Sequence, residues 1–166
     1  KTGVSSPYLE QLGSWGSKTR DPRGWSATHA YFALLPAASA QLEQENEKPA
    51  SWHPVNEDPA LSQLAFDHSH ILQAAVERLR AKVEYTSLPA FLLPEPFTLP
   101  QLQRVYEAVL GRPVDKSGFR TRALAADFLA ERGLMDVGAP RPAMGYRLKD
   151  RQNAVVFPRT FSPRNS

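Results

Sequence analysis

The sequence contains no cysteine, and this absence removes several kinds of chemistry at once. Disulfide bonds, thiolate metal sites and a cysteine nucleophile are all excluded. No apolar run reaches the length of about 18 residues that suggests a membrane span, and no basic-then-apolar segment of the secretory type opens the chain. We therefore expect a cytoplasmic protein that has no membrane partner.

Motifs of the common catalytic sites are also missing. The sequence has no Walker-type loop, no Gly-x-Gly-x-x-Gly and no Gly-x-Ser-x-Gly. His68 and His70 are two residues apart at the start of an expected helix, so they cannot share a helical face and bind one metal ion. We interpret this segment as helix capping and packing, and we predict no catalytic residue and no metal ligand in this chain.

Positive charge is unevenly distributed, although the formal net charge of the 166 residues is only +3. Residues 1–66 carry 5 Lys and Arg against 7 Asp and Glu, whereas residues 97–166 carry 12 against 6. A basic part beside a mildly acidic one is typical of a nucleic-acid-binding module joined to a different domain, because phosphate contact needs local positive charge. A solvated arginine-rich surface would give the same distribution.

The N-terminal half of the sequence predicts two strands and one helix. Residues 7–12 have the pattern of a short strand, residues 13–24 that of a long loop, and residues 25–36 that of a buried strand. An amphipathic helix then begins with Asp67 as its N-cap, because apolar residues recur every three or four positions as far as Val83.

The C-terminal half has the pattern of a helix-turn-helix. Thr98 as N-cap, Pro100 in the first turn and Gly111 as C-cap delimit the first helix. Asp115 can cap a second helix with a basic first turn, and the pattern extends this helix to Gly133. In this arrangement the second helix enters the major groove of DNA by its N-terminal end.

Two short strand-like segments, 134–137 and 144–148, follow around a Gly-Ala-Pro-Arg-Pro turn and complete a winged helix. A wing contacts DNA phosphates or the minor groove, so we predict double-stranded DNA as a partner. The predicted DNA contacts are Lys116, Ser117, Arg120, Arg122, Arg141 and Arg147. The alternative is a winged helix that serves only in packing or protein interaction.

The segment 19–25 places two arginines and an aspartate in a tight Pro-Gly turn. Arginine pairs with phosphate oxygens in a bidentate way, and the strand that follows would fix the position of the turn. We predict that Arg20, Asp21 and Arg23 bind a phosphate-containing ligand. A loop locked by an arginine–aspartate pair explains the same residues.

Taken together, these segments resemble the Nudix-related transcriptional regulators of NAD metabolism, the NrtR group, and the related ADP-ribose pyrophosphatases. The resemblance covers residues 1–149 and rests on the RDPRG loop, the FDH helix start and the FTLPQLQRVYEAVLG helix, in this order. It implies an α+β chain in which the C-terminal part of a Nudix domain (an α/β/α sandwich), residues 1–84, precedes a winged helix-turn-helix, 85–150. It also implies a homodimeric repressor of NAD-related genes that senses ADP-ribose or a related nucleotide. Residues 151–166 show little periodicity, so we expect a mobile tail there.

Residues 1–4 resemble the last four positions of a Nudix box. The resemblance implies that the Mg²⁺-binding glutamates would precede residue 1 and that Lys1 replaces the final glutamate. A cation at that position would repel Mg²⁺, so we expect a nucleotide-sensing domain that is not catalytic and needs no cofactor. The alternative is a Mg-dependent Nudix hydrolase that acts on ADP-ribose and carries an appended winged helix.

Overall fold

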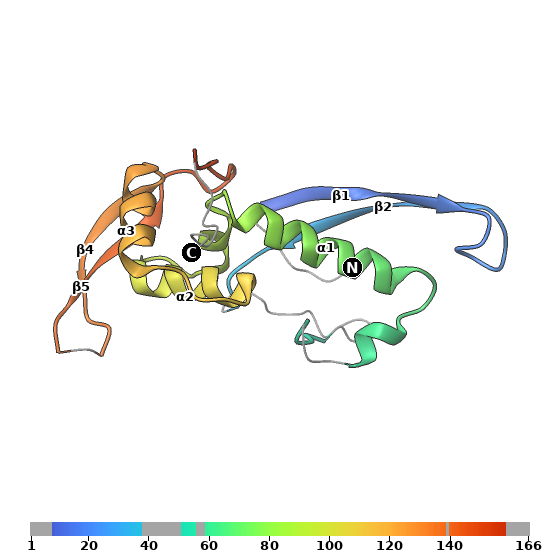
Figure 1. Cartoon of the computed structure of the whole chain (residues 1–166), viewed down its shortest axis with the longest axis horizontal. Coiled ribbons are helices and arrows are strands. Elements are labelled where there is room, and N and C mark those ends of the chain that lie inside the picture. The colour runs from blue at the N-terminus through green and yellow to red at the C-terminus, as the bar shows by residue number, and fades with distance from the viewer. Residues whose placement is uncertain (1–7, 38–50, 56–58, 139, 159–166) are drawn as a thin grey trace, which may run out of the picture.

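The chain is an elongated α+β structure, and the computed structural model describes residues 8–37, 51–55, 59–138 and 140–158. A two-stranded hairpin extends toward one end and a unit of helices and strands lies at the other (Figure 1). Helix α1 (His68–Val83) follows the 3-10 helix η2 (Pro59–Gln63) and runs alongside the hairpin toward the unit of helices and strands (Figure 1). Within the described ranges, no helix is long and apolar enough to cross a membrane.

The hairpin pairs β1 (Tyr8–Ser17) with β2 (Ser26–Leu34) in antiparallel orientation. The loop was predicted to begin at residue 13, and this start was wrong. Strand β1 continues to Ser17 after a register shift between Gln11 and Gly13. Pairing with β2 satisfies the backbone groups of this glycine-rich segment, and the bulge absorbs its irregular register.

The strand predicted at 25–36 is confirmed, but its predicted burial was wrong. Alternate residues of β2 are exposed, and Trp25, just before the strand, is 70% exposed. The opposite face of the strand contributes Phe32 and Leu34 to the core, where Leu79 of α1 also packs. A two-stranded sheet that packs through one face leaves its other face in solvent.

The C-terminal unit is a winged helix. In chain order it contains the 3-10 helix η3 (Leu88–Leu92), β3 (Phe97–Thr98), α2 (Leu99–Leu110), α3 (Lys116–Ala125), β4 (Leu129–Met135) and β5 (Ala143–Leu148). The sheet order is β3-β5-β4, with β5 in the middle. The predicted limits of the first helix are confirmed: Thr98 forms a capping box with Gln101, and Gly111 ends α2 at a φ of 68°.

Helix α3 ends at Ala125 and does not continue to Gly133 as predicted. Asp127 turns the chain at a φ of 54°, Phe128 is buried, and pairing of β4 with β5 begins immediately afterwards. The helix propensity of the alanine-rich segment is therefore overridden by burial and strand pairing, as often happens where tertiary contacts are strong. The second predicted strand, 144–148, is confirmed as β5 and begins one residue earlier.

One core joins the hairpin, α1 and the winged helix. Its buried residues include Leu34 from β2, Val83 from the end of α1, Phe91 from η3, and Tyr106 and Phe119 from α2 and α3. The domain boundary predicted between residues 84 and 85 is crossed by this core, and the division of the chain into two domains there stays a prediction.

The tail predicted to be mobile, 151–166, packs on the protein over its described part. Phe157 is only 5% exposed, and its backbone N–H donates to the carbonyl oxygen of Tyr85 at 2.7 Å. Its ring lies 5.7 Å from that of Phe128, and Val156 forms an isolated bridge with Thr86. An apolar anchor and backbone hydrogen bonds hold residues 155–157 against the protein. Mobility of the tail stays a prediction, and residues 159–166 lie outside the described ranges.

Candidate nucleic-acid interface and nucleotide loop

The first turn of α3 is exposed and tightly capped. The Oδ2 atom of Asp115 accepts a hydrogen bond from the backbone N–H of Gly118 at 2.6 Å. A Cβ atom on Gly118 would lie 2.9 Å from this oxygen, so the glycine allows the cap to close. Lys116, Ser117 and Arg120 are all exposed, and their spacing of three and four places them on one side of the helix. The structure thus brings three predicted DNA contacts together.

The opposite side of α3 fixes its orientation. Phe119 and Ala123 are buried, and the ring of Phe119 packs edge-on against Tyr106 of α2, with centroids 5.1 Å apart. The Tyr106 hydroxyl donates to the carbonyl oxygen of Thr86 at 2.6 Å. Complete burial raises the pKa of Tyr106 well above its ordinary value. Helix α3 is therefore tied through α2 to the segment that follows α1.

The turn between α2 and α3 is held by side chains of α2. The Glu107 carboxylate accepts from the backbone N–H of Val114 and from the Gln103 amide, both at 3.0 Å. The Val114 N–H, followed by the Gln103 amide, lowers the pKa of Glu107. The Gln103 amide also donates to the Val114 carbonyl at 2.9 Å. These bonds fix the turn that leads from α2 into α3.

The wing supplies a second group of cations. Arg141 is exposed in the β4–β5 loop, and Arg147 is exposed on β5, where its register partner on β4 is Ala130. Arg122 differs from the other five predicted DNA contacts, since it is half-buried in the last turn of α3. All six stay predictions as DNA contacts.

A further exposed cation, Arg132, lies in β4 and was missed from the sequence. The predicted second helix included this position, so Arg132 was not assigned to the wing. A correct assignment would have required recognising Asp127 as a turn residue.

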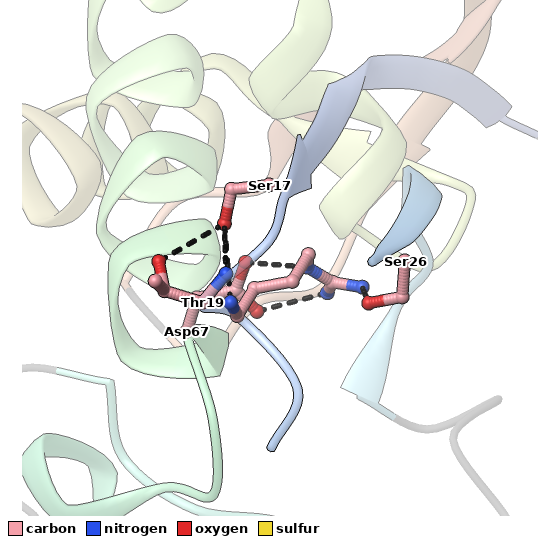
Figure 2. Close-up of polar contacts among 5 residues, drawn as sticks. Ser17, Thr19, Ser26 and Asp67 are labelled. Carbon is pink, nitrogen blue, oxygen red and sulfur yellow. Dashed lines mark hydrogen bonds and ion pairs between the residues drawn. The ribbon is translucent and has the colours of Figure 1, made fainter. Parts of the chain in front are cut away.

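The loop between β1 and β2 is attached to the start of α1 through Arg20. Its Nε and Nη2 atoms donate to the two carboxylate oxygens of Asp67 at 2.8 and 2.9 Å (Figure 2). Its Nη1 atom donates to the hydroxyl of Ser26 at 3.3 Å, and its backbone N–H to that of Ser17 at 3.1 Å. The side chain of Asp67 does not cap α1 as predicted, because both of its oxygens face Arg20.

A second pair lies within the same loop. The Nη2 atom of Arg23 donates to Oδ2 of Asp21 at 2.7 Å, and the side-chain hydrogen bond from Arg23 lowers the pKa of Asp21 to about 2. Arg23 is 84% exposed, whereas the Arg20 side chain is 12% exposed. Both arginines are therefore paired with aspartates, and ligand binding by Arg20, Asp21 and Arg23 stays a prediction.

No group of three or more His, Cys, Asp or Glu that could hold a metal ion occurs among the described residues. Lys1, predicted at the last glutamate position of a Nudix box, lies outside them.

Comparison with known proteins identifies the C-terminal unit. Residues 89–148 match the family of the NrtR DNA-binding winged helix domain. The crystal structure of Shewanella oneidensis NrtR is 42% identical in sequence, with a TM-score of 0.84 over 96% of this chain and 73% of that one. The chain belongs to the NrtR family.

Other relatives agree with this NrtR assignment. Shewanella oneidensis NrtR complexed with a 27mer DNA gives a TM-score of 0.85 at 41% identity, over 96% of this chain and 73% of that one. The ADPR responsive transcriptional repressor NtrR of Acinetobacter baylyi is 41% identical over 159 residues. These residues are 96% of this chain but 63% of the length of that relative.

A structure with lower sequence identity supports the Nudix relation of this NrtR family member. A MutT/nudix family protein from Enterococcus faecalis gives a TM-score of 0.61 at 26% identity, over 89% of this chain and 65% of that one. The predicted fold class, the C-terminal part of a Nudix-like domain followed by a winged helix-turn-helix, is confirmed.

Proposed function

We propose that this chain is the DNA-binding and part of the effector-sensing region of a transcriptional repressor of NAD-related genes. The observation that carries the proposal is the exposed side of α3, which presents Lys116, Ser117 and Arg120 from a winged helix of the NrtR family. Such a surface fits the major groove, where cations meet phosphates and arginine can reach guanine edges. Arg141 and Arg147 of the wing would contact the adjacent backbone.

The effector is proposed to be ADP-ribose or a related nucleotide, bound at the β1–β2 loop. The name of the Acinetobacter baylyi relative, an ADPR responsive repressor, supports this assignment. Arg20 and Arg23 carry guanidinium groups, which pair with a diphosphate as readily as with the aspartates that they now contact. Ligand binding would weaken the complex with DNA.

The protein is proposed to act as a homodimer in the cytoplasm. Winged helices of dimeric repressors read two half-sites of one operator, so two copies would double the phosphate contacts and set the half-site spacing. The relatives named above come from bacteria, whose chromosomal DNA lies in the cytoplasm, and this supports the proposed location.

Hydrolysis of ADP-ribose is the second candidate function, favoured by the structural likeness to a MutT/nudix family protein. We propose that the protein is not a hydrolase, because Lys1 resembles a replacement of the last metal-binding glutamate of the box. Under this proposal the protein needs no cofactor, and Mg²⁺ would be required only if the hydrolase reading holds.

Titration of the full-length protein onto a duplex from its own promoter region separates the two candidates. The expected result is specific binding that ADP-ribose weakens and that falls steeply with salt, roughly a thousandfold between 50 and 200 mM if a dimer neutralises about six phosphates. No specific binding, together with Mg²⁺-dependent hydrolysis of ADP-ribose, would instead establish the enzyme.

A further inference from the structure

We propose that Asp67 exchanges between two partners, Arg20 and the first turn of α1, and that α1 transmits this exchange to α3. Asp67 is thus assigned as a positioning residue for DNA binding. The inference rests on the proposed function, because it concerns the regulation of the same nucleotide loop.

Asp67 occupies a position with two competing uses. Its carbonyl oxygen accepts from the backbone N–H of Ile71 at 3.1 Å, as that of an N-cap residue does, yet its side chain caps nothing. Both carboxylate oxygens accept from Arg20 instead. Its ψ is 13°, whereas a capping aspartate has extended backbone geometry. If Arg20 were withdrawn, the carboxylate would be available to the N–H groups of Ser69 or His70, which have no partner within the helix in its first turn.

That second arrangement requires a change in the backbone at the start of α1. Rotation of the Asp67 ψ into the extended region changes the direction in which the helix leaves the preceding segment. The preceding residue, Phe66, has a φ of 59° and an exposed side chain, an unfavourable conformation for a bulky residue. Strain of this kind persists where neighbouring contacts impose it, and the Arg20–Asp67 pair is the adjacent restraint. Release of the pair would let this segment relax.

A phosphate group is a natural competitor for Arg20. A guanidinium binds a carboxylate or a phosphate through the same two parallel N–H bonds, so it cannot hold both in this way. The hydroxyls of Ser17 and Ser26 already surround Arg20 and offer further donors to a phosphate (Figure 2). A nucleoside diphosphate sugar would therefore bind better to the form in which Asp67 has turned to α1, and this difference in affinity is what shifts the population.

The far end of α1 is fixed to the winged helix. Glu84, directly after α1, accepts from Arg112 in the α2–α3 turn at 2.7 Å. Thr86 accepts from Tyr106 of α2, and the backbone N–H of Ser87 donates to Val155 at 2.9 Å. The helix between the two attachments has 16 residues and spans about 24 Å. A change of direction at Asp67 would therefore be carried to the turn that positions α3.

The test measures operator affinity with and without ADP-ribose for the full-length wild type and for Asp67→Asn. The substitution keeps a good capping residue but removes the charge that holds Arg20. We expect the free variant to bind operator as weakly as the ADP-ribose-bound wild type, with no further effect of ADP-ribose. ADP-ribose is expected to lower the operator affinity of the wild type by some factor. By linkage, Asp67→Asn should bind ADP-ribose more tightly than the wild type by up to the same factor. A merely structural role would not tighten nucleotide binding.

A matched control and a second variant complete the experiment. Glu77→Gln makes the same change at an exposed position of α1, where the side chain bonds to Gln73 of the same helix, and should retain the wild-type response. Glu84→Gln weakens the far attachment and should retain nucleotide binding while reducing the effect of ADP-ribose on operator affinity. The measurement on Glu84→Gln tests the proposal even if Asp67→Asn fails to fold.

The outcomes separate this inference from the proposed function. A wild-type response in either Asp67→Asn or Glu84→Gln would overturn the inference and leave the repressor assignment intact. Wild-type protein whose operator binding is absent, or is insensitive to ADP-ribose, would overturn both.

Discussion

Arg120 and Lys116 are one helical turn apart on α3, and both extend from a helix whose other side is locked into the core by Phe119. A cation on a rigid, capped helix loses little freedom when it binds DNA, because the helix is already in place. At the scale of single residues, Arg120 is therefore the most informative position of the proposed interface.

Arg120→Ala should weaken operator binding by about 1–3 kcal/mol if the guanidinium contacts a base edge. The measurement is a fluorescence anisotropy titration of a labelled duplex at constant salt. Arg80→Ala, which removes an exposed arginine of α1, serves as the control and should bind as the wild type does. Unchanged affinity in Arg120→Ala would remove this residue from the interface.

The residue scale also shows where sequence reasoning reaches its limit. Asp67 was predicted to cap α1 because aspartate before an apolar helix usually does. Its actual partner, Arg20, is 47 residues away, and no local pattern specifies that contact. The same arginine was predicted from the sequence to bind a phosphate-containing ligand, which stays a prediction, and its pairing with Asp67 depends on the tertiary structure.

At the scale of elements, local signals succeeded where caps define both ends of a helix. Thr98 and Gly111 delimit α2 in the sequence and in the structure, because both act through neighbouring backbone groups. The end of α3 carries no such signal: alanines continue past Ala125, and only the burial of Phe128 and the pairing of β4 with β5 end the helix. The strand β1 was predicted too short for a similar reason, since its glycines resemble a loop until β2 pairs with them.

The α2–α3 turn gives a prediction about pH. The pKa of Glu107 in the folded protein is lower than its ordinary value of 4.5. The ionised carboxylate therefore contributes fully to the free energy of unfolding above about pH 4.5. This contribution is lost as the pH falls through the pKa of the folded protein. Glu107→Gln should be less stable than the wild type at pH 7 by up to roughly 1 kcal/mol, and the difference should shrink in acid.

Urea denaturation of both proteins at pH 7 and near pH 3 checks this prediction. Other carboxylates titrate equally in both proteins, so the difference between them isolates Glu107. Glu131→Gln, an exposed position of β4, is the matched control and should follow the wild type at both pH values. A difference between wild type and Glu107→Gln that does not change with pH would contradict the assignment.

At the scale of the whole molecule, the segment after the winged helix connects the two parts of the chain. Residues 151–158 bond to Tyr85 and Ser87, directly after α1, while Phe157 packs on Phe128 before β4. The segment thus reinforces the junction through which α1 would act on the winged helix.

Phe157→Ala should destabilise the protein by about 3 kcal/mol, because a buried phenylalanine leaves a cavity when it is truncated. The neighbouring Val156 is 67% exposed, so Val156→Ala should change the free energy of unfolding by less than about 0.5 kcal/mol. Thermal or urea unfolding followed by circular dichroism distinguishes the two. Equal effects of the two substitutions would show that Phe157 is not an anchor.

The exposed position of Trp25 beside the β1–β2 loop has a spectroscopic consequence. The three tryptophans of the sequence are Trp15, Trp25 and Trp52, and none lies within residues 89–148. Intrinsic tryptophan emission therefore originates outside the winged helix, and Trp25 is two residues from Arg23. A nucleotide at this loop should change the emission directly, so an unlabelled protein can report effector binding separately from a labelled duplex that reports DNA.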